Sequence, residues 1–237
     1  RTAMSKLGNR KQLGGGGLLM CVRTTGSDPS SFLHSPIYSS MEDSDEPSSN
    51  RSRPNLLITG TPGVGKTTTA SMIAEKLGMK HLCVGDLIRE HSCVEGRDER
   101  LQTDILDEDK LIDTLDPMIS DAQEEGVGCV VDYHICEIFP ERWFDLVLVL
   151  RTDTEVLYDR LTARGYSDDK RSENMESEIM QVILEEAREA YDQNIVHEVK
   201  SNTVGEMEST VQRIEQWVEQ WIRDNSQPLA TDNISSE

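Results

Sequence analysis

Short apolar runs recur along the chain, and each is followed by a stretch in which apolar residues return every three or four positions. Runs of this kind predict buried β-strands, and the spacing predicts amphipathic helices. The expected strands are residues 55–59, 81–84, 129–132, 146–150 and 195–199. The expected helices are residues 69–78, 107–126, 154–163, 174–194 and 207–221. Strands that alternate with helices indicate a three-layer α/β fold.

The run at 146–150 has no polar alternation, which indicates a strand that is buried on both faces, as in a parallel sheet covered by helices. In such a sheet, the loops at the carboxyl ends of the strands build the site. Residues 91–106 are polar without a clear period, and we expect a mobile segment there. Residues 164–171 are expected to form a charged loop.

The two ends of the chain differ from the middle in composition. Residues 1–50 are rich in serine and glycine and are expected to be a disordered leader, and residues 226–237 a disordered polar tail, around a domain at 51–225. The basic, acid-poor residues 1–40 resemble an organelle transit peptide. The interpretation we favour is that Met41 is the true start and that the preceding residues are translated upstream sequence.

Charge and cysteine content limit the possible partners. The formal net charge of −20 disfavours direct binding to nucleic acid and would attract a basic protein, although surplus carboxylates also simply keep a protein soluble. No apolar run approaches the ~18 residues of a membrane span. Five cysteines without framework spacing indicate a reducing compartment, with Cys83 and Cys129 as core residues on strands.

One glycine-rich turn carries the strongest chemical signal. The sequence GTPGVGKTT (60–68) lies between the first expected strand and the first expected helix, which is the context of a phosphate-binding loop. Its glycines let the backbone approach a ligand closely, and the N–H groups at a helix N-terminus favour an anion. Lys66 is expected to reach the β- and γ-phosphates of ATP, and the Thr67 hydroxyl to ligate Mg²⁺.

Five segments carry a resemblance to a known family. They are TGTPGVGKTT (59–68), VGDLIRE (84–90), ILDEDKL (105–111), VVDYHICEIFPERWFDLVLVLRTDT (130–154) and RLTARGY (160–166). With these segments the chain resembles the P-loop nucleoside monophosphate kinases, and within them the nuclear adenylate kinase isoenzyme six group, also described as a small-subunit ribosome-assembly ATPase. Residues 132–144 are the most specific part, and a shikimate or gluconate kinase would share the phosphate loop but not that segment.

The resemblance implies a P-loop NTPase fold with a five-stranded parallel sheet, helices on both faces, a mobile acceptor-binding flap at 83–106 and a short lid at 163–174. It implies an ATP site made by Gly63, Gly65, Lys66, Thr67, Thr68 and Arg164. It implies an AMP site that includes Asp86 and Arg89. The implied catalytic residues are Lys66, Asp132, His134 and Arg164, with Thr67 and Asp132 holding Mg²⁺, Asp132 directly or through water.

The implied activity is Mg²⁺-dependent transfer of the γ-phosphate of ATP to AMP, with ATPase activity, by a monomer of the nucleus and cytoplasm. The alternative is an ATP-hydrolysing assembly factor for a basic small-subunit ribosomal protein in 18S rRNA maturation, with little kinase role. Typical adenylate kinases place further arginines near the γ-phosphate, whereas residues 174–187 contain none here, and Arg142 or Arg171 could compensate. With fewer cations, water becomes a possible acceptor.

His134 replaces the usual acceptor-loop arginine, and the sequence leaves its role open. It could be a packed, hydrogen-bonded histidine, a neutral imidazole that positions water, or a group that titrates near neutrality. A metal site formed by His134 and Cys136 is disfavoured, because two ligands are too few.

Overall fold

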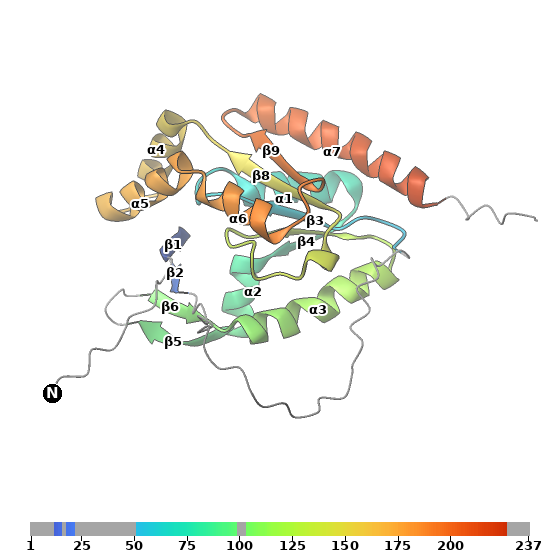
Figure 1. Cartoon of the computed structure of the whole chain (residues 1–237), viewed down its shortest axis with the longest axis horizontal. Helices are drawn as coiled ribbons and strands as arrows, with labels where there is room; N and C mark the ends of the chain where they lie inside the picture. The colour runs from blue at the N-terminus through green and yellow to red at the C-terminus, as the bar shows by residue number, and fades with distance from the viewer. Residues whose placement is uncertain (1–11, 16–17, 22–50, 99–102, 227–237) are drawn as a thin grey trace, which may run out of the picture.

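A five-stranded parallel sheet forms the centre of the protein (Figure 1). The structure is a computed structural model that describes residues 12–15, 18–21, 51–98 and 103–226. Across the sheet the strands are β4 (Lys80–Cys83), β7 (Cys129–Asp132), β3 (Leu56–Thr59), β8 (Leu146–Arg151) and β9 (Val196–Lys200). Every neighbouring pair is parallel, so the expected α/β P-loop architecture is confirmed.

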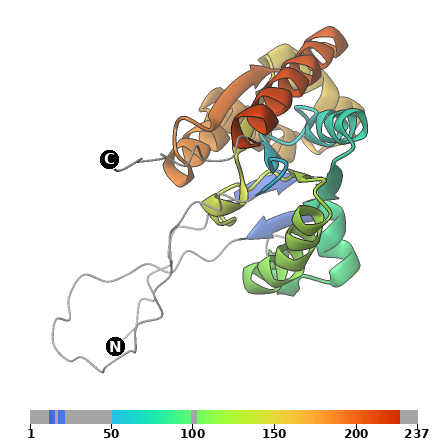
Figure 2. The same cartoon turned by 90° about the vertical axis from the view of Figure 1, so that its right-hand side faces the viewer.

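Helices cover both faces of the sheet because successive side chains of a strand point to opposite sides. Leu56 and Ile58 enter one apolar cluster, and Leu57 between them enters the other. The first cluster is covered by α1 (Lys66–Leu77), α4 (Thr154–Ala163) and α7 (Val204–Asn225). The second is covered by α2 (Val84–His91), α3 (Glu108–Glu124) and α6 (Val182–Ala190). Figure 2 shows α7, in red, and α3, in green, on opposite sides of the sheet.

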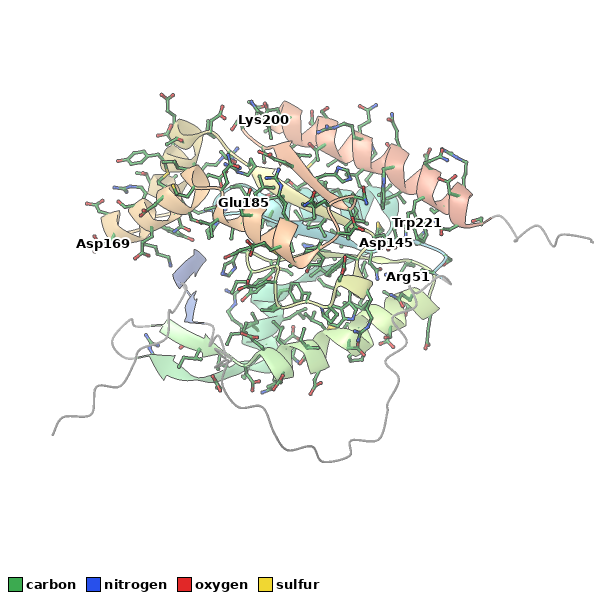
Figure 3. All side chains as sticks on the ribbon, in the orientation of Figure 1. Arg51, Asp145, Asp169, Glu185, Lys200 and Trp221 are labelled. Atoms are coloured by element: carbon green, nitrogen blue, oxygen red, sulfur yellow. The ribbon has the colours of Figure 1, made fainter. Side chains whose placement is uncertain are left out.

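A polar cluster ties together the amino-terminal ends of the three inner strands. The buried Asn55 side chain accepts a hydrogen bond from the Cys129 amide (3.0 Å) and donates one to the Trp143 carbonyl (3.0 Å). Asp145 accepts from the Asn55 amide (2.8 Å) and pairs with Arg51 (3.4 Å), beside which it lies in Figure 3. These contacts fix one end of the sheet and leave its carboxyl end to build the site.

Several helix boundaries follow from local chemistry that the sequence already displays. Asp107 caps α3 by accepting a hydrogen bond from the Lys110 amide, as the acids at 107–109 predict. Helix α4 has the expected bounds, and α7 begins with a capping box formed by Thr203 and Glu206. The described helices include none that is both long enough and apolar enough to cross a membrane.

Two expectations about local structure are wrong. The helix expected at 174–194 is two helices, α5 (Asp168–Ile179) and α6, separated at Gln181, whose φ of 58° is left-handed. Helix α5 begins within the expected charged loop, because the Ser167 side chain accepts a hydrogen bond from the Lys170 amide. The apolar residues of 174–194 keep the spacing of one continuous helix, because only two residues separate α5 from α6.

The expected mobile segment at 91–106 also contains regular structure. Strands β5 (Val94–Asp98) and β6 (Thr103–Leu106) pair in antiparallel fashion, and residues 99–102 between them lie outside the described residues. In the expected disordered leader, β1 (Gln12–Gly15) and β2 (Leu18–Cys21) form a pair that extends this small sheet at β6. The remaining leader residues and residues 227–237 lie outside the described part, so the expectation of disorder is untested there.

Candidate active site

The phosphate loop connects the end of β3 at Thr59 to the start of α1 at Lys66. Its backbone requires glycine at two positions that are closely packed against other elements. Gly60 has a φ of 138°, and a Cβ there would lie 2.5 Å from the Leu150 carbonyl oxygen. Gly63 has a φ of 102°, and a Cβ there would lie 2.8 Å from Leu157 Cδ1. A side chain at either position is therefore excluded by the backbone conformation and by lack of space, which suits a loop that fits closely around an anion.

Lys66 folds back over the loop that precedes it. Its Nζ donates to the carbonyl oxygens of Gly60 (2.8 Å) and Thr61 (3.2 Å). Burial lowers the pKa of Lys66 to about 8, although the Asp132 carboxylate acts in the opposite direction. The ammonium group is thus largely charged at pH 7 but poorly solvated, which favours its interaction with a phosphate that enters the loop.

Asp132 lies at the carboxyl end of β7 and faces the start of α1. Its Oδ1 accepts a hydrogen bond from the Thr67 hydroxyl (3.2 Å), and its Oδ2 lies 2.7 Å from His81 Nε2 on the neighbouring strand β4. The side chain of Asp132 is 5% exposed, so these contacts fix the carboxylate. His81 was not expected to take part, and only the parallel pairing of β4 with β7 brings it here.

The residues at this position fit a magnesium ion. Thr67 and Asp132 present a hydroxyl and a carboxylate oxygen beside the phosphate loop, and Mg²⁺ prefers such hard oxygen ligands together with water and phosphate oxygens. When bound, the ion would neutralise charge on the β- and γ-phosphates. The role of Thr67 and Asp132 as its ligands stays a prediction.

His134 follows β7 and is buried at 8% exposure. Its Nε2 is buried and has no hydrogen-bond partner among the described residues, which is unusual for a polar atom and is consistent with a partner supplied by ligand or water. Burial lowers the pKa of His134 to about 3, and the positive charges of Lys66 and Lys170 contribute. Of the three roles that the sequence leaves open, these observations favour the neutral imidazole.

We expect this buried imidazole to make stability depend on pH. Because the pKa of His134 is lower in the folded protein, between about pH 6.5 and pH 3 this residue is protonated in the unfolded chain but not in the folded protein. Stability should therefore fall as the pH falls below 6.5, by about 2 kcal/mol at pH 5. Urea unfolding of the wild type and His134→Asn at pH 7 and pH 5 measures this loss, which the variant should lack; parallel losses in both proteins would contradict the prediction.

All ten of the expected site residues line one cavity. They are Gly63, Gly65, Lys66, Thr67, Thr68, Asp86, Arg89, Asp132, His134 and Arg164. Residues of α2 form one wall: Asp86 and Arg89 are exposed and pair with each other. Arg164 enters from the end of α4. In Figure 1, α4 and α5 lie on the left above β5 and β6, and α2 lies below the central sheet, nearer the middle. Elements that are far apart in the sequence thus meet at the carboxyl end of the sheet.

The structure also shows where the two arginines that could compensate for the missing cations lie. Neither Arg142 nor Arg171 is among the described residues that line the cavity, and Arg171 instead pairs with Asp168 and lies 4.7 Å over the ring of Tyr158. The described cations of the cavity wall are therefore Lys66, Arg89 and Arg164. Cys83, expected to be a core residue, is half-buried and lines the cavity, whereas Cys129 is fully buried as expected.

Arg160 is a further residue that the sequence did not single out. Its guanidinium donates to the carbonyl oxygens of Ser201 (2.8 Å) and Asn202 (2.9 Å), and more weakly to that of Val64 (3.4 Å). It therefore connects α4 with the loop after β9 and with the phosphate loop. Two signals could have drawn attention to it: it begins the RLTARGY segment (160–166), and it lies four residues before Arg164, on the same helix face.

Comparisons with known proteins show the family of the chain. A family model described as an AAA domain matches residues 56–181. An adenylate kinase isoenzyme 6 homolog of Schizosaccharomyces pombe is 46% identical over 175 residues, which cover 74% of this chain and 97% of the relative. Another, from Caenorhabditis elegans, is 51% identical over 164 residues, which cover 69% of this chain and 88% of the relative.

More distant proteins are similar as well. A putative adenylate kinase of Pyrococcus furiosus is 36% identical over 152 residues, 64% of this chain and 78% of its own. A solved shikimate kinase from Bacteroides thetaiotaomicron covers 70% of this chain and 98% of its own at a TM-score of 0.45 and 19% identity, too distant to inform on substrate. The phosphate loop, the sheet order and the curated relatives agree: the chain belongs to the family of adenylate kinase isoenzyme 6 homologs, within the P-loop NTPases.

Proposed function

We propose that the protein is a Mg²⁺-dependent adenylate kinase that transfers the γ-phosphate of ATP to AMP and yields two molecules of ADP, and that it also has ATPase activity. The observation that carries the proposal is the shared cavity, in which the phosphate loop with Lys66 and Thr67 faces Asp86 and Arg89 of α2. A cavity with an anion site on one wall and a second cation on another suits a phosphoryl donor and an anionic acceptor.

The residues would act mainly by alignment and by charge neutralisation, because phosphoryl transfer asks little covalent chemistry of the protein. Lys66 and Arg164 would supply positive charge to the phosphates of ATP, and Arg89 would hold the acceptor phosphate. The neutral His134 would donate or accept a hydrogen bond at the acceptor oxygen. The same imidazole could orient a water molecule, which supports a measurable ATPase activity when AMP is absent.

Paired product analysis tests the proposal. ADP and free phosphate are measured with ATP and Mg²⁺, with and without AMP, for the wild type, His134→Ala and the matched control His197→Ala. His197 lies exposed on β9, away from the cavity. We expect AMP to raise ADP formation and suppress phosphate release in the wild type and the control, and both activities to fall in His134→Ala. Phosphate release that ignores AMP, without additional ADP, would argue against the kinase assignment.

A second function is favoured by the charge of the chain and by the few cations of the cavity wall. With a net charge of −20, the protein would attract a basic partner, and we propose a basic small-subunit ribosomal protein whose assembly, in 18S rRNA maturation, is driven by ATP hydrolysis in the nucleus and cytoplasm. A pull-down with such a protein at physiological salt should show binding that changes with the bound nucleotide. Binding that is insensitive to nucleotide, or no binding, would exclude this function.

A further inference from the structure

Glu178 is a buried carboxylate in the last turn of α5 that does not line the cavity and that the proposed reaction does not use. The residue is 3% exposed. Its carboxylate accepts three hydrogen bonds from outside its own helix: from the Thr61 hydroxyl (2.5 Å), the Arg151 Nε (2.6 Å) and the Thr152 amide (3.0 Å). A buried charge with this many donors is held in one position.

Arg151 holds the main chain of the same residue as well. A terminal nitrogen of its guanidinium donates to the Glu178 carbonyl oxygen (2.8 Å), while Nε binds the side chain. The end of α5 is therefore fixed against the end of β8, and Gln181 breaks the helix shortly afterwards. The first residue of α5 is Asp168, which lies within the expected lid. One helix thus connects the lid to this buried anchor.

The third partner, Thr61, belongs to the phosphate loop. Its hydroxyl binds Glu178, and its carbonyl oxygen accepts a hydrogen bond from Lys66 (3.2 Å). Phosphate oxygens that enter the loop compete with this carbonyl for the ammonium group. When Lys66 turns toward a phosphate, its hydrogen bond to the Thr61 carbonyl oxygen weakens. Thr61 is in turn bonded through its hydroxyl to Glu178 of helix α5.

We propose that Glu178 is a positioning residue that links the phosphate loop to the lid, so that ATP binding at Lys66 is transmitted through the Thr61 hydroxyl to helix α5. The inference rests on the proposed function only in that ATP binds the loop. If Glu178 had a purely structural role, its ion pair with Arg151 would matter but α5 would not respond to ATP. The response of α5 to ATP therefore distinguishes the two roles and can be measured.

The sharpest variant is Thr61→Val, which removes the hydroxyl at nearly constant volume and leaves Glu178 bonded to Arg151 and Thr152. Thr61→Ser is the matched control, because it keeps the hydroxyl. Hydrogen exchange of the α5 amides is followed with and without saturating Mg²⁺-ATP, and ATP affinity is measured by calorimetry. We expect ATP to slow exchange in α5 in the wild type and Thr61→Ser. In Thr61→Val the affinity should fall roughly tenfold and the slowing should be lost at saturation.

Glu178→Met, which has a similar length but no carboxylate to accept from the Thr61 hydroxyl, provides an independent measurement, with thermal unfolding as a check that the variant folds. If both residues act through one hydrogen bond, the double variant Thr61→Val/Glu178→Met should lose no more ATP affinity than Glu178→Met alone. Additive losses, or an unchanged ATP response of α5 in Thr61→Val, overturn the inference while the proposed function stands. A folded wild type that shows no ATP binding in calorimetry would instead remove the proposed function, and the inference with it.

Discussion

A Lys66→Ala variant is expected to lose ADP formation from ATP and AMP by about 10³-fold, because it removes the positive charge nearest the transferred phosphate. The ammonium group is already held at the loop by the carbonyl oxygens of Gly60 and Thr61. No other described residue of the loop can replace this charge, since the remaining cations of the cavity wall lie on α2 and at the end of α4. The measurement is initial-rate ADP formation at saturating Mg²⁺, with ATP binding by calorimetry.

Lys76→Ala is the matched control for this variant. Lys76 lies on the same helix α1, half-exposed, and pairs with Glu215 of α7 (2.7 Å). Its replacement removes the same charge and a similar volume far from the loop, and an exposed ion pair contributes little to stability. We expect full activity from the control. Full activity from Lys66→Ala as well would remove the basis for assigning the loop to ATP.

The second large effect is expected for Asp132→Asn, which should lower the rate of ADP formation roughly 100-fold and raise the Mg²⁺ concentration needed for half-maximal activity. The substitution keeps the size of the side chain but neutralises the carboxylate that contacts Thr67 and His81. An amide is a weaker ligand for a hard cation than a carboxylate. A Mg²⁺ titration of the rate at fixed ATP separates weaker metal binding from slower transfer.

Asp116→Asn is the control for this charge change, since Asp116 is exposed on α3. It should match the wild type in rate and in Mg²⁺ dependence. Circular dichroism and thermal unfolding check that Asp132→Asn is folded, because its carboxylate is buried. A folded Asp132→Asn with an unchanged Mg²⁺ dependence would show that the metal is held elsewhere.

The sequence predicts the fold well where local chemistry decides it. The apolar run at 146–150 and the alternation of strands and helices lead to a parallel sheet, and Asp107 marks the start of α3 correctly. The same local pattern fails at Gln181, because apolar residues on both sides of the break continue a helical period. The break occurs where Arg151 and Thr61 bind Glu178, and such contacts between distant residues leave no trace in local periodicity.

The candidate site shows the same division. The spacing of the phosphate loop and the family resemblance lead to all ten expected residues of the cavity wall. The sequence does not predict a role for His81, because it lies in an ordinary strand sequence. Only the pairing of β4 with β7 places its Nε2 2.7 Å from Asp132 Oδ2. For Arg171, which the sequence leaves open as a compensating cation, only the folded chain shows the contacts with Asp168 and Tyr158.

Neighbouring residues alone indicate the phosphate loop, the five strands of the central sheet and the residues that could meet a nucleotide, because turn geometry and hydrophobic period are local properties of the sequence. Only the folded arrangement shows that His134 is buried with a lowered pKa, that His81 contacts Asp132, and that Glu178 of α5 accepts a hydrogen bond from Thr61 of the phosphate loop. Protonation depends on burial and on surrounding charge, and hydrogen bonds between distant residues depend on how the elements pack. Both arise only when the chain has folded.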